Sequence, residues 1–174
     1  MKKTLLTWQL AGFCIVSLLG TLLHFLYDWS NQNVVIAPFS AVNESTWEHM
    51  KILFFPLFAF ALVQNKKISL HYENFLCVKT VGILTGVILV PIIFYTANGA
   101  FGKTPDWVNI LIFFVANAGA FLAEYLLFTK TKGATKCNSK WIPLAILIAV
   151  ALLFVIFTFV PPQIPLFADP TASN

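Results

Sequence analysis

The densest polar run in this chain is residues 43–51, where two carboxylates, an imidazole, an ammonium and an indole fall within one or two helical turns. His24 and Asp28 end the preceding apolar segment, so we expect them at the same depth as this run. His24 and Asp28 are four residues apart, as are Glu44 and Glu48, and each pair can share a helix face. The candidate outer cluster is therefore His24, Asp28, Glu44, Glu48 and His49.

Imidazole and carboxylate groups at this spacing are able to bind a divalent metal. Zn²⁺ takes such mixed ligand sets and keeps a water in an open position. The candidate metal ligands are His24, His49, Glu44 and Glu48, and Zn is the candidate cofactor. In a hydrolase of this kind a metal-bound water is the nucleophile, and Glu44 or Glu48 is the general base. No His-x-x-x-His or His-Glu-x-x-His motif is present, so no catalytic residue is assigned.

A structural interpretation of the same run stands beside the chemical one. Ser45-x-x-Glu48 matches a capping box at a helix start, and both glutamates lie near the positive end of that helix dipole. Glu48 can also form an ion pair with Lys51. On this interpretation the run does no more than begin a helix.

A second candidate constellation is the intramembrane pair Lys79 and Glu124. Each lies five or six residues from the same end of its predicted helix, so at a 1.5 Å rise per residue both are roughly 8 to 9 Å deep. Charged residues within membrane spans usually face the interior of the bundle and pair with one another. A structural clamp is the preferred interpretation, a proton or ion relay is the alternative, and Lys79 could also extend alone to the interface.

Composition indicates a membrane protein. Hydrophobic residues make up 59% of the 174-residue chain and charged residues only 10%, against roughly 25% charged in soluble domains. At ~20 residues per crossing, about five spans fit and no separate soluble domain does. The chain has no Arg, the residue favoured for bidentate phosphate and base recognition, so we expect no nucleic-acid partner.

The predicted fold is an all-α polytopic membrane bundle that forms one domain over residues 1–174. The N-terminal apolar stretch is too long for the apolar region of a signal peptide, and Tyr27 and Trp29 suit an aromatic belt at the membrane interface. Pro56 is expected to kink the second span. The expected spans are about 5–27, 46–64, 74–96, 106–129 and 141–160, followed by a Pro-rich tail over 161–174 that folds back over the outer ends of the helices.

Lysines indicate the orientation of the bundle. One side of a five-span arrangement carries Lys2, Lys3, Lys66, Lys67, Lys130, Lys132, Lys136 and Lys140, while the other has only Lys51 and Lys103. The positive-inside rule then places the N-terminus inside and the C-terminus outside, with the candidate outer cluster. Cys14, Cys77 and Cys137 show no Cys-x-x-Cys spacing and are expected to be free thiols.

Three sequence blocks carry a resemblance to a known family. They are His24-Phe25-Leu26-Tyr27-Asp28-Trp29, Asn43-Glu44-Ser45-Thr46-Trp47-Glu48-His49, and the tail Pro-Pro-x-Ile-Pro-Leu-Phe-x-Asp-Pro. Over its whole length the chain resembles a family of small bacterial integral-membrane proteins of unknown function. The resemblance implies location in the bacterial cytoplasmic membrane and brings no activity. In style alone the chain is similar to ceramidases and adiponectin-receptor-like hydrolases, but it has five expected spans rather than seven and no paired-His motif.

Two classes of function remain open on this basis. The first is a non-enzymatic protein that binds a lipid, peptide or protein partner at its outer face, in a pocket made by the kinked second span, the 28–45 loop and the tail. The second is a metal-dependent membrane hydrolase that uses the outer His and carboxylate cluster. A transporter ranks third, because five spans leave no inverted repeat and a pathway would need a homodimer. The sequence does not predict the oligomeric state.

Overall fold

The computed structural model describes residues 2–72, 74–130, 139 and 141–171. Within these residues the chain is helical and has no strand. The long helices are α1 (Lys2–Trp29), α2 (Thr46–Ile68), α3 (Phe75–Phe101), α4 (Asp106–Lys130) and α5 (Trp141–Phe159), and the short 3₁₀ helices are η1 (Ser69–His71) and η2 (Pro165–Phe167). Four residues used in the sequence arguments lie outside the described part, namely Lys132, Lys136, Cys137 and Lys140.

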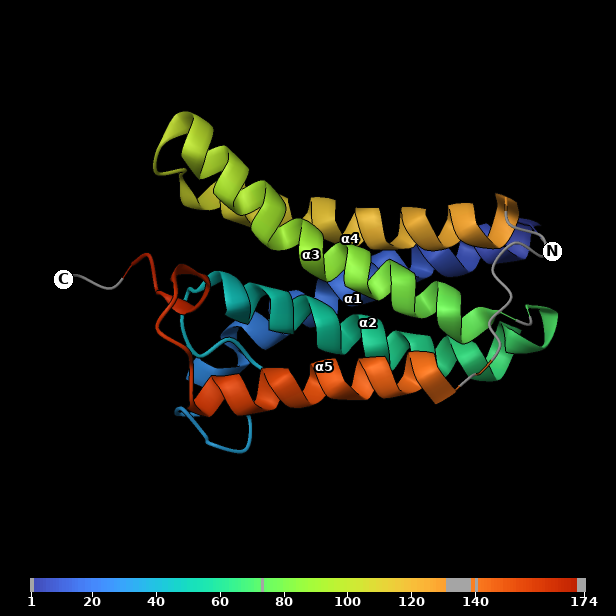
Figure 1. Cartoon of the computed structure of the whole chain (residues 1–174), viewed down its shortest axis with the longest axis horizontal. Coiled ribbons are helices and arrows are strands. Elements are labelled where there is room, and N and C mark those ends of the chain that lie inside the picture. The colour runs from blue at the N-terminus through green and yellow to red at the C-terminus, as the bar shows by residue number, and fades with distance from the viewer. Residues whose placement is uncertain (1, 73, 131–138, 140, 172–174) are drawn as a thin grey trace.

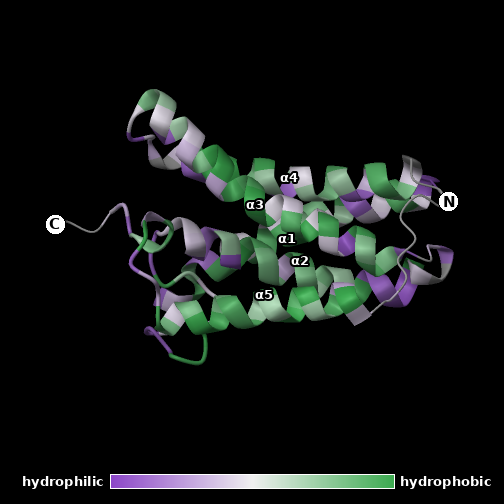
Figure 2. Cartoon of the chain, in the orientation of Figure 1, coloured by the Kyte–Doolittle hydropathy of each residue, from purple (hydrophilic) through white to green (hydrophobic). Residues whose placement is uncertain are grey.

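All five long helices are long and apolar enough to cross a membrane. Apolar residues occupy most of the length of the helices, and polar residues gather toward the two ends of the bundle (Figure 2). On α1 and α5 many large apolar side chains are exposed, including Leu10, Leu18, Ile142 and Leu152. A multi-pass membrane protein accounts for this pattern, because lipid tails can cover apolar side chains that water would not.

The five helices pack as one bundle around α2, the most buried of them (Figure 1). α3 packs along α4 and α2, α1 packs against α2 and α4, and α5 lies along α2 and α3. The two ends of the chain lie at opposite ends of the bundle (Figure 1), as an odd number of crossings requires. The end at which α1 stops and α2 starts is termed the outer end, after the predicted orientation.

Glycines allow α3 to approach α4 closely. A Cβ atom added at Gly86 would lie 2.8 Å from the Cβ of Ala120, and one added at Gly82 would lie 2.2 Å from Cγ of Glu124. Real Cβ atoms do not approach so closely, so these two positions of the Gly-x-x-x-Gly motif have no room for a side chain. The absence of a side chain at Gly82 makes space for the buried Glu124.

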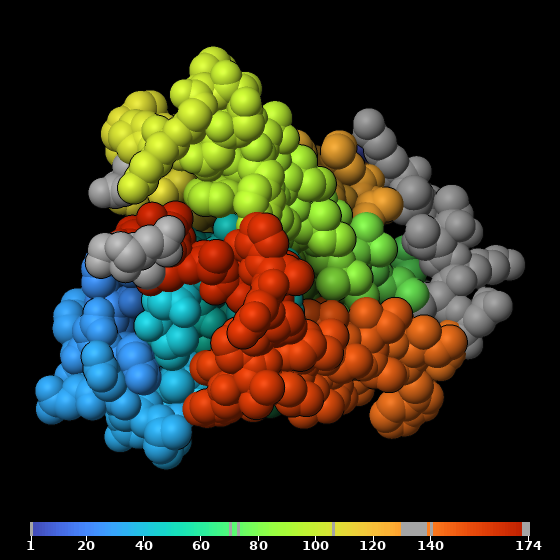
Figure 3. Space-filling view, turned by 60° about the vertical axis from the view of Figure 1, so that its left-hand side comes forward, coloured from blue at the N-terminus to red at the C-terminus, as the bar shows by residue number. Residues whose placement is uncertain are grey.

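The C-terminal tail folds back over the outer end of the bundle (Figure 3). The Phe167 ring lies 4.7 Å from the Trp47 ring and 5.6 Å from the Phe157 ring, measured between centroids. Aromatic contacts of this kind explain how a segment with four prolines is held against the helices, with Leu166 and Phe167 partly buried while Ile164 stays exposed.

The cysteines differ from the expectation. Cys14 is a free thiol, but Cys77, near the start of α3, is disulfide-bonded. The expectation that every cysteine is free was therefore wrong, because it rested on spacing alone, and spacing does not show which thiols meet in the folded chain.

Candidate functional site

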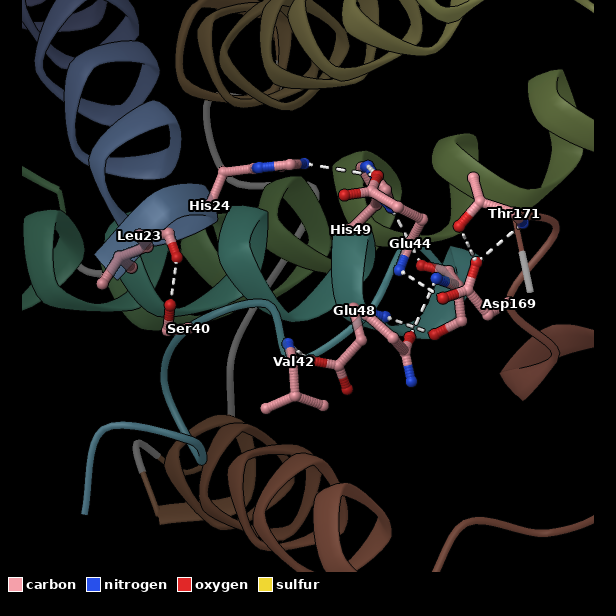
Figure 4. Close-up of polar contacts among 11 residues, drawn as sticks. Leu23, His24, Ser40, Val42, Glu44, Glu48, His49, Asp169 and Thr171 are labelled. Atoms are coloured by element: carbon pink, nitrogen blue, oxygen red, sulfur yellow. Dashed lines mark hydrogen bonds and ion pairs between the residues drawn. The ribbon is translucent and has the colours of Figure 1, made fainter. Parts of the chain in front are cut away.

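Three side chains of the candidate outer cluster converge at the outer end, and they are termed the outer triad: His24, Glu44 and His49. The Glu44 Oε2 atom lies 3.5 Å from His24 Nε2 and 3.6 Å from His49 Nε2. The two imidazole rings meet edge to face, with centroids 5.4 Å apart. Figure 4 shows both rings directed at the same carboxylate.

Each member of the outer triad comes from a different element. His24 stands just over one turn before the end of α1, His49 lies in the first turn of α2, and Glu44 belongs to the loop that joins the two helices. The His49 ring is oriented by its own helix, since Nδ1 lies 2.9 Å from the backbone carbonyl oxygen of Ser45. A carbonyl only accepts, so Nδ1 carries a proton, and Nε2 is the ring nitrogen that faces Glu44.

Glu44 is held by contacts on both its side chain and its backbone. The hydrogen bond from His24 lowers the pKa of the Glu44 carboxyl below its usual range, so the group stays ionised down to a lower pH. The backbone N–H of Glu44 donates to Asp169 Oδ2 of the tail at 3.4 Å, and Asp169 Oδ1 accepts from the N–H and the hydroxyl of Thr171. The tail therefore helps to position this carboxylate (Figure 4).

All three residues of the outer triad line a pocket of about 370 Å³. The remaining walls are mostly apolar and come from α1, α2 and α4, with Pro170 and Thr171 of the tail at the edge; they include Gly20, Phe25, Ile52, Ile110, Phe113 and Phe114. Ligand pockets typically have volumes of ~300–1,000 Å³ and combine apolar walls with a few convergent polar groups. This pocket has both properties.

Asn109 is a pocket residue that the sequence analysis did not select. It stands in the first turn of α4 and lines the pocket, and its Oδ1 atom is buried with no hydrogen-bond partner. A buried acceptor without a partner is uncommon in proteins and calls for an explanation. A lone amide at the start of an apolar helix was the available signal, but nothing in the sequence linked it to residues 24–49.

Glu48 and Asp28 do not join the outer triad. The Glu48 carboxylate lies 2.6 Å from Lys51 Nζ and accepts the backbone N–H of Val42 at 2.9 Å, and this side chain is buried. Glu48 is therefore engaged in contacts with Lys51 and Val42 and is not among the three residues whose ligand atoms lie together. Asp28 is exposed and acts on His24 only through its charge.

The capping box is half formed. Ser45 Oγ accepts the backbone N–H of Glu48 at 3.4 Å, as that motif requires. The reciprocal bond is replaced, since the Ser45 N–H donates to Asn43 Oδ1 at 2.9 Å. Capping thus accounts for Ser45 and part of Glu48, and it leaves Glu44 and His49 unexplained.

Two of the three ligand-atom separations in the outer triad match those around a tetrahedral divalent metal. One ligand atom from each of its residues lies within 4.8 Å of the others. Two ligand atoms that are each ~2.0–2.2 Å from a tetrahedral Zn²⁺ lie roughly 3.3–3.6 Å apart, and Glu44 Oε2 is 3.5 and 3.6 Å from the two nitrogens. Two histidines and one glutamate with an open fourth position are a ligand set of catalytic zinc sites.

The intramembrane pair Lys79 and Glu124 lies in the other half of the bundle. Lys79 Nζ donates to Glu124 Oε2 at 2.6 Å, and both side chains are fully buried. Lys79 Nζ also lies 5.3 Å from the centroid of the Phe121 ring, within the range of a cation–π contact. These contacts compensate in part for removing both charges from water.

Comparison with known proteins adds one finding. A family model described as a family of unknown function (DUF6512) matches residues 1–174. Searches of curated proteins and of solved structures gave no match.

The intramembrane pair predicts a specific pattern in a double-mutant cycle. Lys79→Met or Glu124→Gln alone leaves an uncompensated buried charge or a buried group without its partner, and each should lower the free energy of unfolding by about 3–5 kcal/mol. Lys79→Met combined with Glu124→Gln should recover part of that loss, as measured by unfolding of the detergent-solubilised protein. Lys103→Met, at an exposed lysine, is the matched control. Strictly additive losses would contradict a direct pair.

Proposed function

Because the chain belongs to the DUF6512 family of unknown function, we propose its function from the geometry of the outer end: the pocket binds an amphiphilic, lipid-like ligand at the outer face. The observation that carries this proposal is the pocket itself, whose apolar walls end at two imidazoles and a carboxylate. An acyl or other apolar chain would pack against the wall formed by Phe113, Phe114 and Ile110. The polar group of the ligand would contact the outer triad and Asn109.

Two further features support a lipid-like ligand over a soluble one. Two apolar residues that line the pocket, Phe25 and Ile110, are themselves exposed on the surface of the bundle, so a membrane lipid would have an apolar path to it. The charged or titratable lining groups are the three of the outer triad, which lie within ligand distance of one another, and this matches a molecule with a single polar group. A peptide or protein partner would instead require polar groups spread over a wider surface.

Filling the pocket should block binding. Thr21 is exposed on α1 and lines the pocket, so Thr21→Phe places a ring in the space that the ligand would occupy. Native mass spectrometry with a single-chain lysophospholipid as the probe should show at least a tenfold loss of affinity relative to wild type. Thr7→Phe is a matched control, because Thr7 is also exposed on α1 and bonds the carbonyl four residues back, as Thr21 does. Equal binding by both variants would overturn the proposal.

A metal-dependent membrane hydrolase is the second candidate function, and the convergence of the outer triad favours it. His24, Glu44 and His49 would hold a Zn²⁺ ion, which would supply the activation of water that hydrolysis of an ester or amide bond requires. Asn109 Oδ1 could accept a hydrogen bond from that water. Glu44 would serve as a ligand in this arrangement, so the residue that acts as general base is not assigned.

Zinc titration separates the two candidates. If the protein is a zinc hydrolase, wild-type protein in detergent should bind about one Zn²⁺ by calorimetry, and the combined change His24→Ala and His49→Ala should abolish that binding, a loss greater than the ~10- to 100-fold seen when an outer-shell partner is removed. His71→Ala, at an exposed histidine outside the triad, should leave binding unchanged. Absence of zinc binding by wild type would remove the hydrolase and leave the ligand-binding proposal. Zinc-dependent cleavage of an ester lipid probe would establish the hydrolase.

We also propose that the protein lies in the bacterial cytoplasmic membrane, with the N-terminus inside and the outer triad outside. The support is the lysine distribution, since Lys2, Lys3, Lys66 and Lys67 all lie at the end of the bundle opposite the triad.

Reporter fusions test this orientation. A reporter placed after Asn174 should report outside, and one inserted after Lys67 should report inside. The reverse result would place the outer triad in the cytoplasm. The reverse result would also place the disulfide-bonded Cys77 nearer the outside, which would agree with the persistence of disulfides in oxidising compartments.

A further inference from the structure

The half of the bundle opposite the outer triad contains a layer of four buried polar side chains, one from each of α1 to α4. This inner layer consists of Gln9, Gln64, Lys79 and Glu124, and each is at most 4% exposed. Only the last two were selected from the sequence. Burying four polar side chains at one depth of an apolar bundle costs free energy unless they form hydrogen bonds with one another or with a bound molecule.

Packing contacts place the members of the inner layer at the same level. Gly12, about one turn along α1 from Gln9, faces the Phe60 ring of α2 and the Phe121 ring of α4. Because α2 and α4 both run antiparallel to α1, one turn further along each of them lies beside Gln9. Those positions are Gln64 and Glu124, and Gln9 does interact with the Glu124 side chain.

Most polar atoms of the inner layer have no partner in the described part of the protein. Both side-chain atoms of Gln9, both of Gln64, and Oε1 of Glu124 are buried and make no hydrogen bond of ordinary geometry. Among the described residues, the bond between Lys79 Nζ and Glu124 Oε2 is the one of ordinary geometry within the layer, and the Gln9 contact with Glu124 falls short of it. Several unsatisfied groups in one place are rare, because each has lost its hydrogen bonds to water without gaining one within the protein, which destabilises the folded state.

The donor and acceptor character of these unsatisfied atoms indicates which kind of molecule or ion could bind them. Three are acceptors, the amide oxygens of Gln9 and Gln64 and the free carboxylate oxygen of Glu124, and two are amide N–H₂ donors. A cation would fit the acceptors, but it would meet the Lys79 ammonium and leave the amide donors unpaired. An anion would be repelled by Glu124. Water both donates and accepts, and buried waters typically make about three hydrogen bonds to such groups.

We propose that the inner layer is a water-binding site, in which Gln9 and Gln64 hold water against the free oxygen of Glu124. The bound water solvates the intramembrane ion pair from the side that Lys79 does not cover. It also gives the Glu124 carboxylate contact with exchangeable protons, which a dry clamp would lack. The two glutamines are the residues that position the water.

The sign of a stability change tests this site. Gln9→Met and Gln64→Met keep the unbranched shape of the side chain and remove its polar atoms. If the amides hold water, each change should lower the melting temperature of the solubilised protein, because Glu124 loses its solvation. If the amides are merely unsatisfied, each change should leave the melting temperature unchanged or raise it, which would overturn the proposal. Gln163→Leu, at an exposed glutamine, is the control and should have no effect.

Repeating the two glutamine changes in a variant without the ion pair separates the effect of losing bound water from the effect of losing side-chain packing. In the variant Lys79→Met with Glu124→Met no charge needs solvation, so the same glutamine changes should cost nothing there. An equal fall in melting temperature in both backgrounds would assign the effect to packing and overturn the proposal.

A measurement on the intact wild-type protein does not depend on any variant folding. Radiolytic labelling oxidises side chains next to bound water. Phe60 and Phe121, which flank the inner layer and are 5% and 4% exposed, should be labelled, whereas Phe54, which is fully buried among aromatic rings in the outer half of α2, should not. Equal protection of all three rings would overturn the proposal.

Discussion

The arrangement of the outer end depends on one buried ammonium group. Lys51 is fully buried, and its three N–H donors have three acceptors: Glu48 Oε2 at 2.6 Å, the carbonyl oxygen of Ala37 at 2.8 Å, and Thr158 Oγ1 at 2.9 Å. A buried charge is tolerated when its donors are satisfied in this way. Because these acceptors come from α2, the connecting loop and α5, the single ammonium fixes all three relative to one another. Losing any one of them would leave a buried donor without a partner.

Fixing the loop is what brings the outer triad together. With Glu48 committed to Lys51 and to the N–H of Val42, the loop is held against the start of α2, and Ser40 ties it to α1 by donating to the Leu23 carbonyl and accepting the Tyr27 N–H at 2.9 Å. Glu44 is then the carboxylate that remains free to meet the two histidines. Of the two glutamates in residues 43–51, Glu48 therefore has a structural role, whereas Glu44 lines the pocket, and the chemical interpretation of the run stays a prediction.

The sequence predicted what composition and depth determine. Five helices long and apolar enough to span a membrane followed from the lengths of the apolar runs, and the Lys79–Glu124 contact followed from equal depth in neighbouring helices. It could not show which of Glu44 and Glu48 meets the histidines, because both lie within a turn of the α2 start and the loop backbone decides between them. Nor could it show that Lys51 is buried, since two of its acceptors are contributed by Ala37 and Thr158, which are distant in sequence. Gln9, Gln64 and Asn109 were missed because a lone amide in an apolar helix has no recognisable spacing partner.

The two buried lysines differ in how completely the protein satisfies the polar groups around them. At the outer end every donor of Lys51 is matched by the protein itself, which suits a rigid support for a binding site. In the inner layer Lys79 makes one charged hydrogen bond and two aromatic contacts, while the other carboxylate oxygen of Glu124 and both glutamine amides are unsatisfied by protein. A purely structural clamp would gain stability from apolar residues of similar volume at these positions, since replacing a buried ion pair in that way is often neutral or stabilising. Polar groups beyond those needed for the pair therefore favour a role that requires water or protons at this depth over a role in stability alone.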